Sequence, residues 1–290
     1  MIGKIKRIFA VLVVTTVVLG GLVGCSSSPS NKGDSTGAAA ESIAAIKDRG
    51  TIKIGVFSDK APFGYVDSNG ENQGFDVYIA KRFAKDLLGD ESKVEFVLVD
   101  AASRVAYLES GKVDIIMANF TVTDERKQKV DFANPYMKVS LGIVSPDSAV
   151  ITSIDQLKGK KAIVAKGTTT ETFLIKNYPE IELVKYEQYS EIFQALKDGR
   201  GDAIVNDNTE VIAWAKENPG FTVGVSTLGG QDTIAPAVTK GNKELQDWIN
   251  TELETLGKEN FIHKAYEATL TSVYGADYEE SLVIEGGKIK

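Results

Sequence analysis

The segment Met117-Ala-Asn-Phe-Thr-Val-Thr-Asp-Glu-Arg126 joins an apolar run to a polar turn that can begin a helix. Thr123 has the side chain of a helix N-cap, and two acids follow it in the first turn, where the helix dipole favours them. Arg126 then stands where a Glu would complete a capping box, and a cation there is locally unfavourable. An anion held by backbone N–H groups, the Thr121 hydroxyl and the guanidinium would balance this charge. The alternative is an Arg126 that is solvated or paired with a nearby acid.

Short apolar runs alternate with amphipathic helical patterns on both sides of this segment. Before or within it, the patterns predict strands over 51–57, 94–99 and 113–118, and helices over 75–88 and 104–109. After it they predict strands over 141–144, 161–165, 183–186, 202–206 and 233–238, and helices over 169–177, 190–198, 209–217, 242–257 and 259–271. Strands that alternate with helices indicate βαβ units, so the predicted fold class is α/β.

The order of these elements predicts two lobes, each a mostly parallel sheet flanked by helices. We expect residues 45–142 and 236–290 to form the first lobe and residues 146–232 to form the second. The chain would cross between the lobes near 142–146 and 232–236. Ligands of such folds bind at the carboxyl ends of the strands, which is where the polar clusters of this sequence lie.

The N-terminal segment has the composition of an export signal followed by a tether. Three cations precede an apolar run from Ile8 to Leu19, which is too short to span a membrane comfortably. Leu22-Val-Gly-Cys25 follows and resembles the lipobox of bacterial lipoproteins, so Cys25 would carry a lipid anchor. Residues 1–24 are thus predicted to be a lipoprotein signal peptide, and residues 25–44 a flexible tether. The alternative is an ordinary signal peptide with an incidental cysteine.

Composition argues against several classes of function. The chain carries 40 acidic and 33 basic residues, and this net charge of −7 is unsuited to binding nucleic acid or an anionic membrane surface. With one cysteine and one histidine it offers no Cys/His metal set, so we expect no metal and no cofactor. The histidine, His263, lies in a helical pattern far from the polar clusters. We expect it to be packed or at the surface, and not to act as a catalytic base.

Two further polar clusters follow predicted strands of the second lobe. Thr168 and Thr169 come after the strand over 161–165, and Thr168 with Glu171 matches a capping box. The cluster is therefore either a plain helix cap or a second helix N-terminus that binds an anion. Asp207 follows the strand over 202–206, where it would either meet an ammonium group or cap the next helix.

The first lobe contributes two more candidates. Arg104 begins a helix after a strand and would either meet a polar group of a ligand or pair with Asp100. Phe63 lies in the loop after the first strand and would form an apolar wall of the pocket or belong to the core. Together, Arg126 and the two helix N-termini suit a carboxylate, and Asp207 suits an ammonium group. These are the two ends of the head group of a free α-amino acid.

From about Ala45 onward the chain resembles the solute-binding proteins of ABC transporters for polar amino acids. The resemblance rests on Ala61-Pro-Phe-Gly64, Gly74-Phe-Asp76, Val113-Asp114, Phe120-Thr-Val-Thr-Asp-Glu-Arg126, Phe132 with Pro135-Tyr136, Gly167-Thr-Thr169 and Asp202-Ala203. It implies the two-lobed periplasmic-binding-protein fold of type II. It also implies that Arg126 binds the α-carboxylate with help from threonines 121, 168 and 169, and that Asp207 binds the α-ammonium. Asn119 and Lys60 complete the predicted ligand-binding set.

Within that family the chain is most similar to cysteine-binding lipoproteins, through residues 54–66, 229–244 and 283–289. Lysine and arginine binders carry an acid near position 57 and aromatic residues near 60 and 101. Phe57, Lys60 and Ala101 stand there in this chain, which disfavours a cationic ligand. Arg104 resembles the arginine that meets the side-chain carboxylate in aspartate and glutamate binders, so an acidic amino acid is the main rival to cysteine.

The resemblance also implies the partners and the location of the protein. We expect a monomer outside the cytoplasm, at the outer face of the cell membrane or in the periplasm, that contacts the membrane only through the lipid anchor. It would deliver its amino acid to the permease of an ABC importer. We expect no enzyme activity, although dehydratases related to these binders share the fold and form the rival class. A surface receptor or adhesin is a third class. Its only support is the expected display at the cell surface.

Overall fold

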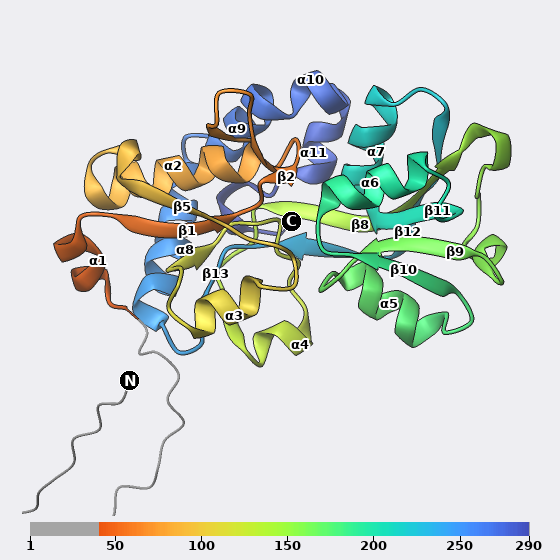
Figure 1. Cartoon of the computed structure of the whole chain (residues 1–290). Coiled ribbons are helices and arrows are strands. Elements are labelled where there is room, and N and C mark those ends of the chain that lie inside the picture. The colour runs from red at the N-terminus through yellow and green to blue at the C-terminus, as the bar shows by residue number, and fades with distance from the viewer. Residues whose placement is uncertain (1–40, 290) are drawn as a thin grey trace, which may run out of the picture. The chain divides into compact units, whose positions relative to one another are not determined.

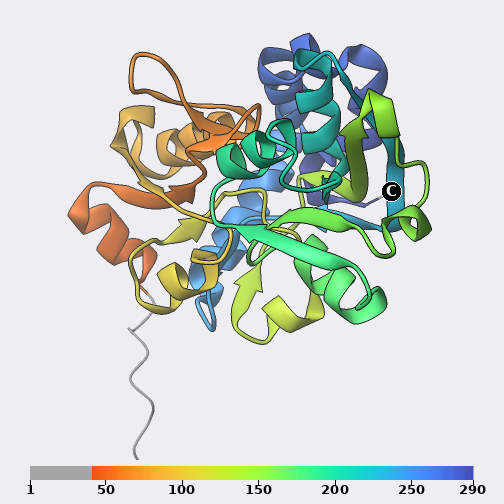
Figure 2. The same cartoon turned by 45° about the vertical axis from the view of Figure 1, so that its right-hand side comes forward.

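The computed structural model describes residues 41–289, which form two lobes that lie side by side (Figures 1 and 2). The predicted signal peptide, Cys25 and most of the predicted tether lie outside the described residues. Ile43 and Ala44, at the predicted end of the tether, instead form the first turn of helix α1 (Ile43–Arg49). The Ser42 side chain caps this helix by accepting a hydrogen bond from the Ala45 N–H. No helix within residues 41–289 is long and apolar enough to cross a membrane.

The first lobe is built on a five-stranded sheet of order β5-β1-β6-β13-β7. Its strands are β5 (Val94–Leu98), β1 (Ile52–Val56), β6 (Ile115–Ile116), β13 (Ala237–Thr239) and β7 (Val130–Phe132). β5, β1 and β6 are parallel, and β13 is antiparallel to both of its neighbours. Four of the five strands therefore run in one direction. A small sheet of β2 (Asp59–Lys60), β3 (Gly64–Val66) and β4 (Asn72–Gln73), which the sequence did not predict, follows β1.

The second lobe repeats this plan with a sheet of order β10-β9-β11-β8-β12. Its strands are β10 (Glu182–Tyr186), β9 (Lys161–Ala165), β11 (Ala203–Asp207), β8 (Met137–Pro146) and β12 (Phe221–Ile234). Only β8 runs against the other four, since it is antiparallel to both β11 and β12. The predicted α/β fold with mostly parallel sheets in two lobes is therefore confirmed.

Helices cover the faces of the two sheets, and the two longest each carry an apolar stripe. They are α2 (Phe75–Leu88), α3 (Arg104–Glu109), α4 (Asp124–Lys127), α5 (Thr169–Asn177), α6 (Tyr189–Lys197), α7 (Asn208–Glu217), α8 (Lys243–Gly257), α9 (Phe261–Thr269), α10 (Thr271–Tyr274) and α11 (Glu279–Leu282). In α2, Phe75, Ile79 and Phe83 recur at the period of a helix and are fully buried in the first core. After the second lobe, α8 and α9 return to pack on the first lobe (Figure 1).

Two long strands, β8 and β12, carry the chain between the lobes. They pair from Phe221 opposite Pro146 in the second lobe to Ile234 opposite Met137, which is packed in the first core. The predicted crossings at 142–146 and 232–236 fall within β8 and at the end of β12, and their role as a hinge stays a prediction. Thr121 forms a bridge with Ile234, so the segment quoted first lies directly against this connection.

Candidate functional site

Arg126 sits at the short helix that the sequence predicted. The Thr123 hydroxyl accepts a hydrogen bond from the Arg126 N–H at 3.2 Å, as an N-cap does. The guanidinium folds back and donates to the backbone carbonyls of Thr121 at 2.7 Å and Gly167 at 3.0 Å. Its central carbon lies 4.6 Å from the centre of the Phe120 ring. Within residues 41–289 it has no ion pair, so the predicted alternative of pairing with a nearby acid is not observed.

Arg104 is buried beside it, with only 3% of its surface exposed. Its guanidinium donates to four backbone carbonyls, those of Ala101 (2.9 Å), Ala118 (3.0 Å), Asn119 (3.2 Å) and Gly167 (3.2 Å). The predicted alternative that Arg104 pairs with Asp100 is wrong, because Asp100 accepts instead from the Gln188 side chain of the second lobe. Burial lowers the pKa of Arg104. Burial, and then the neighbouring Arg104, also lower the pKa of Arg126.

These two guanidiniums form a centre of positive charge, and neither makes a direct ion pair with another residue of the described chain, 41–289. They lie against the same Phe120 ring, with the Arg104 carbon 4.4 Å from its centre, and both donate to the Gly167 carbonyl. Carbonyl oxygens satisfy hydrogen bonds but carry only partial negative charge. Desolvated cations without an anion are costly. The arrangement can therefore hold an anionic group of a ligand.

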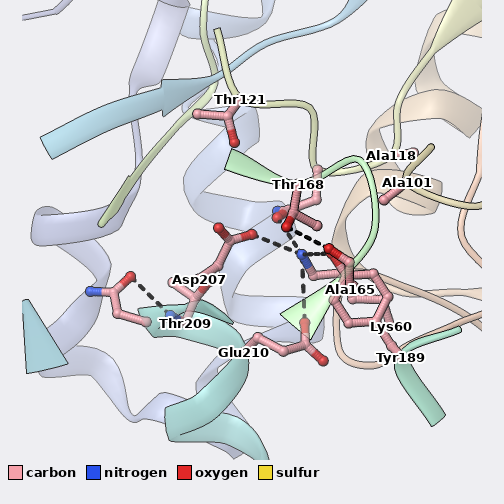
Figure 3. A network of polar contacts seen from close by, with 12 residues as sticks. Lys60, Ala101, Ala118, Thr121, Ala165, Thr168, Tyr189, Asp207, Thr209 and Glu210 are labelled. Carbon is pink, nitrogen blue, oxygen red and sulfur yellow. Dashed lines mark hydrogen bonds and ion pairs between the residues drawn. The ribbon is translucent and has the colours of Figure 1, made fainter. Parts of the chain in front are cut away.

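Lys60 is the third cation of the site and lies at the centre of Figure 3. Only 1% of its surface is exposed. Its ammonium donates to Asn119 Oδ1 at 2.9 Å, Asp207 Oδ2 at 2.8 Å and the Tyr189 hydroxyl at 3.3 Å. Glu210 Oε2 lies 3.8 Å away. Burial alone would lower the pKa of Lys60, but these acids and the tyrosine raise it above its ordinary value.

Asp207 occupies the N-cap position of α7, yet its side chain makes no capping hydrogen bond. It pairs with Lys60 across the lobes (Figure 3). The predicted alternative of a cap is therefore wrong, and the carboxylate is directed to a cation. A second acid one helical turn further, Glu210, is also buried, and burial raises its pKa to about 8 against the opposing effect of Lys60. The sequence did not predict Glu210 as a site residue. The only feature that could have indicated it is its position on the buried face of α7.

The backbone of Asn119 is held by another buried acid that the sequence did not single out as a site residue. Asp76 accepts from the Asn119 N–H at 2.7 Å and from the Tyr136 hydroxyl at 2.7 Å. Burial raises the pKa of Asp76 to about 7, against these two hydrogen bonds. Asn119 has a positive φ of 44°, so this anchoring fixes an unusual backbone conformation at the end of β6.

The threonine cluster begins α5 as predicted. The Thr168 hydroxyl accepts from the Glu171 N–H at 3.2 Å and donates to the Ala165 carbonyl at 2.7 Å. The Glu171 carboxylate accepts from the Gly167 N–H at 2.8 Å. The predicted pairing of Thr168 with Glu171 is therefore confirmed, except that Glu171 binds the N–H of the residue before the N-cap and not that of the N-cap itself. Thr168 is thus fully engaged as a cap, whereas Thr169 lines an open cavity.

That cavity has a volume of about 470 Å³ and is lined by both lobes. Its walls include Phe120 and Arg126 from the first lobe and Thr169, Phe173 and Leu228 from the second. Lys60, Thr121, Thr168 and Asp207 are buried and do not line it, and the Lys60–Asp207 pair lies between the lobes. Phe63 does not line it either. It is fully buried in the core of the first lobe, so the prediction of a Phe63 wall is corrected in favour of Phe120.

The single histidine of the sequence contacts an acid near the end of the described residues. His263 lies on α9, half-buried, with Nδ1 2.7 Å from a Glu285 carboxylate oxygen, which agrees with the prediction of a packed or surface side chain. In residues 41–289 no group of three or more His, Cys, Asp and Glu side chains is arranged to hold a metal.

Comparison with known proteins identifies the family to which this geometry belongs. The model of the bacterial extracellular solute-binding proteins, family 3, matches residues 52–271. The chain belongs to this family. A relative among characterised proteins is the ABC transporter glutamine-binding protein GlnH of Bacillus subtilis (strain 168), which is 35% identical over 267 residues, covering 90% of this chain and 96% of that protein.

Two solved structures of this solute-binding family are more similar in sequence. The solute receptor for L-cysteine of Neisseria gonorrhoeae is 56% identical with a TM-score of 0.83, covering 84% of this chain and 100% of that one. The cysteine-binding protein of Campylobacter jejuni is 52% identical with a TM-score of 0.83, covering 84% and 98%. The resemblance to amino-acid solute-binding proteins is thereby confirmed.

Proposed function

We propose that the protein captures a free polar L-amino acid, cysteine, outside the cytoplasm and delivers it to an ABC importer. The observation that carries this proposal is the pair of guanidiniums, Arg104 and Arg126, that share the Gly167 carbonyl and have no carboxylate partner among residues 41–289. A ligand carboxylate would provide the missing negative charge through charge-assisted hydrogen bonds.

The opposite end of an amino acid would meet Asp207. One of its oxygens holds Lys60, which leaves the other to accept from a ligand ammonium. Thr121, Asn119 and Thr169 would complete the hydrogen bonding of the head group, with Lys60 behind them. The Thr168 hydroxyl would keep its place as the cap of α5. Phe120 replaces Phe63 as the proposed apolar wall.

Cysteine is favoured by the identity of the relatives and by the charges of the site. The two receptors for cysteine share 56% and 52% identity with this chain, against 35% for the glutamine-binding protein. Lys60, Arg104 and Arg126 make the site strongly cationic, which disfavours ligands with a positive side chain. An acidic amino acid is the second candidate, because Arg104 has no carboxylate partner within residues 41–289. Its guanidinium already donates to four carbonyls, which weakens that case.

The route to the importer is also part of the proposal. Acylation of Cys25 would anchor a monomer to the outer face of the membrane, and the segment after it would let the lobes reach the permease. The lobes would close on the amino acid about β8 and β12, with the crossings near 142–146 and 232–236. The permease would then recognise the closed form.

Calorimetric titration tests the ligand. The protein is unfolded and refolded to remove bound ligand, then titrated with cysteine under reductant and with cystine, glutamine, aspartate, glutamate and arginine. Tight one-to-one binding of cysteine is expected. A preference for aspartate, glutamate or glutamine would keep the class of protein and overturn the ligand, and silence across the panel would contradict the proposed function.

Substitution of Arg126 tests the carboxylate site. Arg126→Ala should weaken cysteine binding by about 100-fold or more, because charge-assisted hydrogen bonds to the carboxylate are lost. Lys129→Ala is the matched control, since Lys129 is an exposed cation at the edge of the same cavity. It should change affinity less than about threefold because its charge is screened by solvent. Equal effects of the two substitutions would remove Arg126 from the site.

A further inference from the structure

The two residues of β2 reach out of the first lobe and contact the second at separate points. The Lys60 ammonium bonds to Tyr189 and Asp207, as described above. The neighbouring carboxylate, Asp59, accepts from the Ser190 N–H at 2.9 Å and from the Ser190 hydroxyl at 3.2 Å. Ser190 lies in the first turn of α6, where unpaired N–H groups and the positive end of the helix dipole favour an acid. In the second lobe, the positive charge of Lys60 therefore meets a carboxylate, and the negative charge of Asp59 meets the positive end of a helix.

The geometry of Lys60 leaves it no donor for a ligand. An ammonium group has three hydrogens, and Asn119, Asp207 and Tyr189 provide three acceptors within 3.3 Å. Two aromatic rings flank the same nitrogen, Tyr189 at 4.5 Å and Phe57 at 5.5 Å from their centres. The charge is thus enclosed by protein groups from both lobes.

The second lobe depends on this cation when the lobes are together. Asp207 and Glu210 are buried there with 6% and 2% of their surfaces exposed, and Lys60 is the only cation within ion-pair distance of either among residues 41–289. Burying the Asp207 carboxylate without a cation would oppose closure. Lys60 would therefore balance the charge of the Asp207 carboxylate when the lobes close, while Asp207 also faces the ligand.

We propose that Asp59 and Lys60 form a clasp that holds the closed lobes together, and that Lys60 is a positioning residue that orients Asp207 without touching the ligand. This inference rests on the proposed function. It predicts that the clasp sets how long the amino acid stays bound, whereas the head-group contacts set which amino acid binds.

The clasp is tested in the full-length protein with Lys60→Met and Asp59→Asn, which alter one point of contact each. Lys85→Met and Asp48→Asn are matched controls, because both residues are exposed on helices of the first lobe. Affinities for the amino-acid panel are measured by calorimetry, and dissociation rates by stopped-flow tryptophan fluorescence. Thermal unfolding shows which variants fold.

Lys60→Met should weaken every ligand that binds by a common factor of about tenfold or more, mainly through faster dissociation. Asp59→Asn should act in the same direction with a smaller factor, about threefold, since Asp59 is half-buried and Asn still accepts a hydrogen bond. The order of preference among the ligands should not change. A changed order would make Lys60 a ligand contact and overturn the inference, as would dissociation rates equal to those of the controls. If Lys60→Met does not fold, Asp59→Asn decides alone by the same criterion.

Small-angle scattering separates this inference from the proposed function. If the unaltered protein binds none of the amino acids, the proposed function fails. The clasp is then judged from the radius of gyration without ligand, because in that case no amino acid is needed to close the lobes and the contacts of Asp59 and Lys60 alone would hold them. A larger radius in Lys60→Met or Asp59→Asn than in the controls would support the clasp. An unchanged radius would overturn it.

Discussion

At the scale of single residues, Glu210 is the most unusual group of the site. It is buried in the second lobe, and the charged groups around it are Lys60, Asp207 and Asp59. Burial raises its pKa from an ordinary 4.5 to about 8, so the folded protein binds a proton that the unfolded chain releases between these values. Stability from this group is therefore fully present below about pH 4.5 and decreases as the pH rises towards 8.

Glu210→Gln should remove this part of the pH dependence. The free energy of unfolding, measured in urea, should fall less between pH 5 and pH 8 in the variant, by about 1–3 kcal/mol. Burial also raises the pKa of Asp76, to about 7. In both proteins this group makes the free energy of unfolding fall further as the pH rises. Glu267→Gln is the control, because Glu267 is an exposed acid of α9. Parallel pH profiles for Glu210→Gln and the unaltered protein would show that Glu210 does not titrate in this range.

At the scale of elements, the loop between β9 and α5 decides how closely the lobes approach. Gly167 has a φ of 71°, and a Cβ added there would lie 2.5 Å from the Ala102 Cα of the first lobe. Gly167→Ala should therefore prevent full closure and weaken ligand binding at least about tenfold. Gly159→Ala is the matched control. Gly159 has a φ of 74° but nothing within 4 Å of its added Cβ, so it shares the backbone strain and not the clash.

Thermal unfolding and calorimetry check this pair of variants. Both should lose a similar amount of stability, about 1 kcal/mol, because an L side chain is strained at positive φ. Only Gly167→Ala should lose affinity. Equal affinity in the two variants would mean that the loop does not limit closure.

Local signals explain which elements the sequence predicted well. The bounds of α2, α3 and α5 match the prediction because each segment carries a local signal. For α2 these are its apolar spacing and the stop at Gly89, for α3 the stop at Ser110-Gly111, and for α5 the Thr168 cap and Pro179 after its end. The small sheet of β2, β3 and β4 and all of β12 before residue 233 were missed. Their strands are either two or three residues long or rich in glycine and polar residues, so they show no period.

The site was harder to predict than the fold because its partners are distant in sequence. Lys60 and Asp207 are 147 positions apart, and no local pattern links them. The cap at Thr123 and the unfavourable position of the Arg126 charge followed from local chemistry alone. Phe63 was misassigned because a lone aromatic residue carries no information about which side of a loop it faces.

At the scale of the whole described chain, the proposed closure and the proposed ligand binding would depend on the same charges. Lys60, Arg104 and Arg126 of the first lobe all donate to groups of the second lobe. The acids nearest to them are Asp207, which is shared with Lys60, the buried Asp76 and Glu210, and Asp232, which lines the cavity with Arg126. Burial raises the pKa of Asp76 to about 7 and that of Glu210 to about 8. A ligand carboxylate would supply the negative charge that remains missing, so the amino acid would stabilise the closed lobes more than the open ones.

Solution scattering with and without ligand should therefore report closure. Saturating cysteine should reduce the radius of gyration of the unaltered protein, because hinge motion about β8 and β12 brings the lobes together. Arginine, whose side chain the cationic site disfavours, should have no effect at the same concentration. Arg126→Ala should keep its larger radius when cysteine is added at the concentration that saturates the unaltered protein. A radius that stays constant while calorimetry shows cysteine binding would contradict the hinge, since the lobes would then be closed before the ligand arrives.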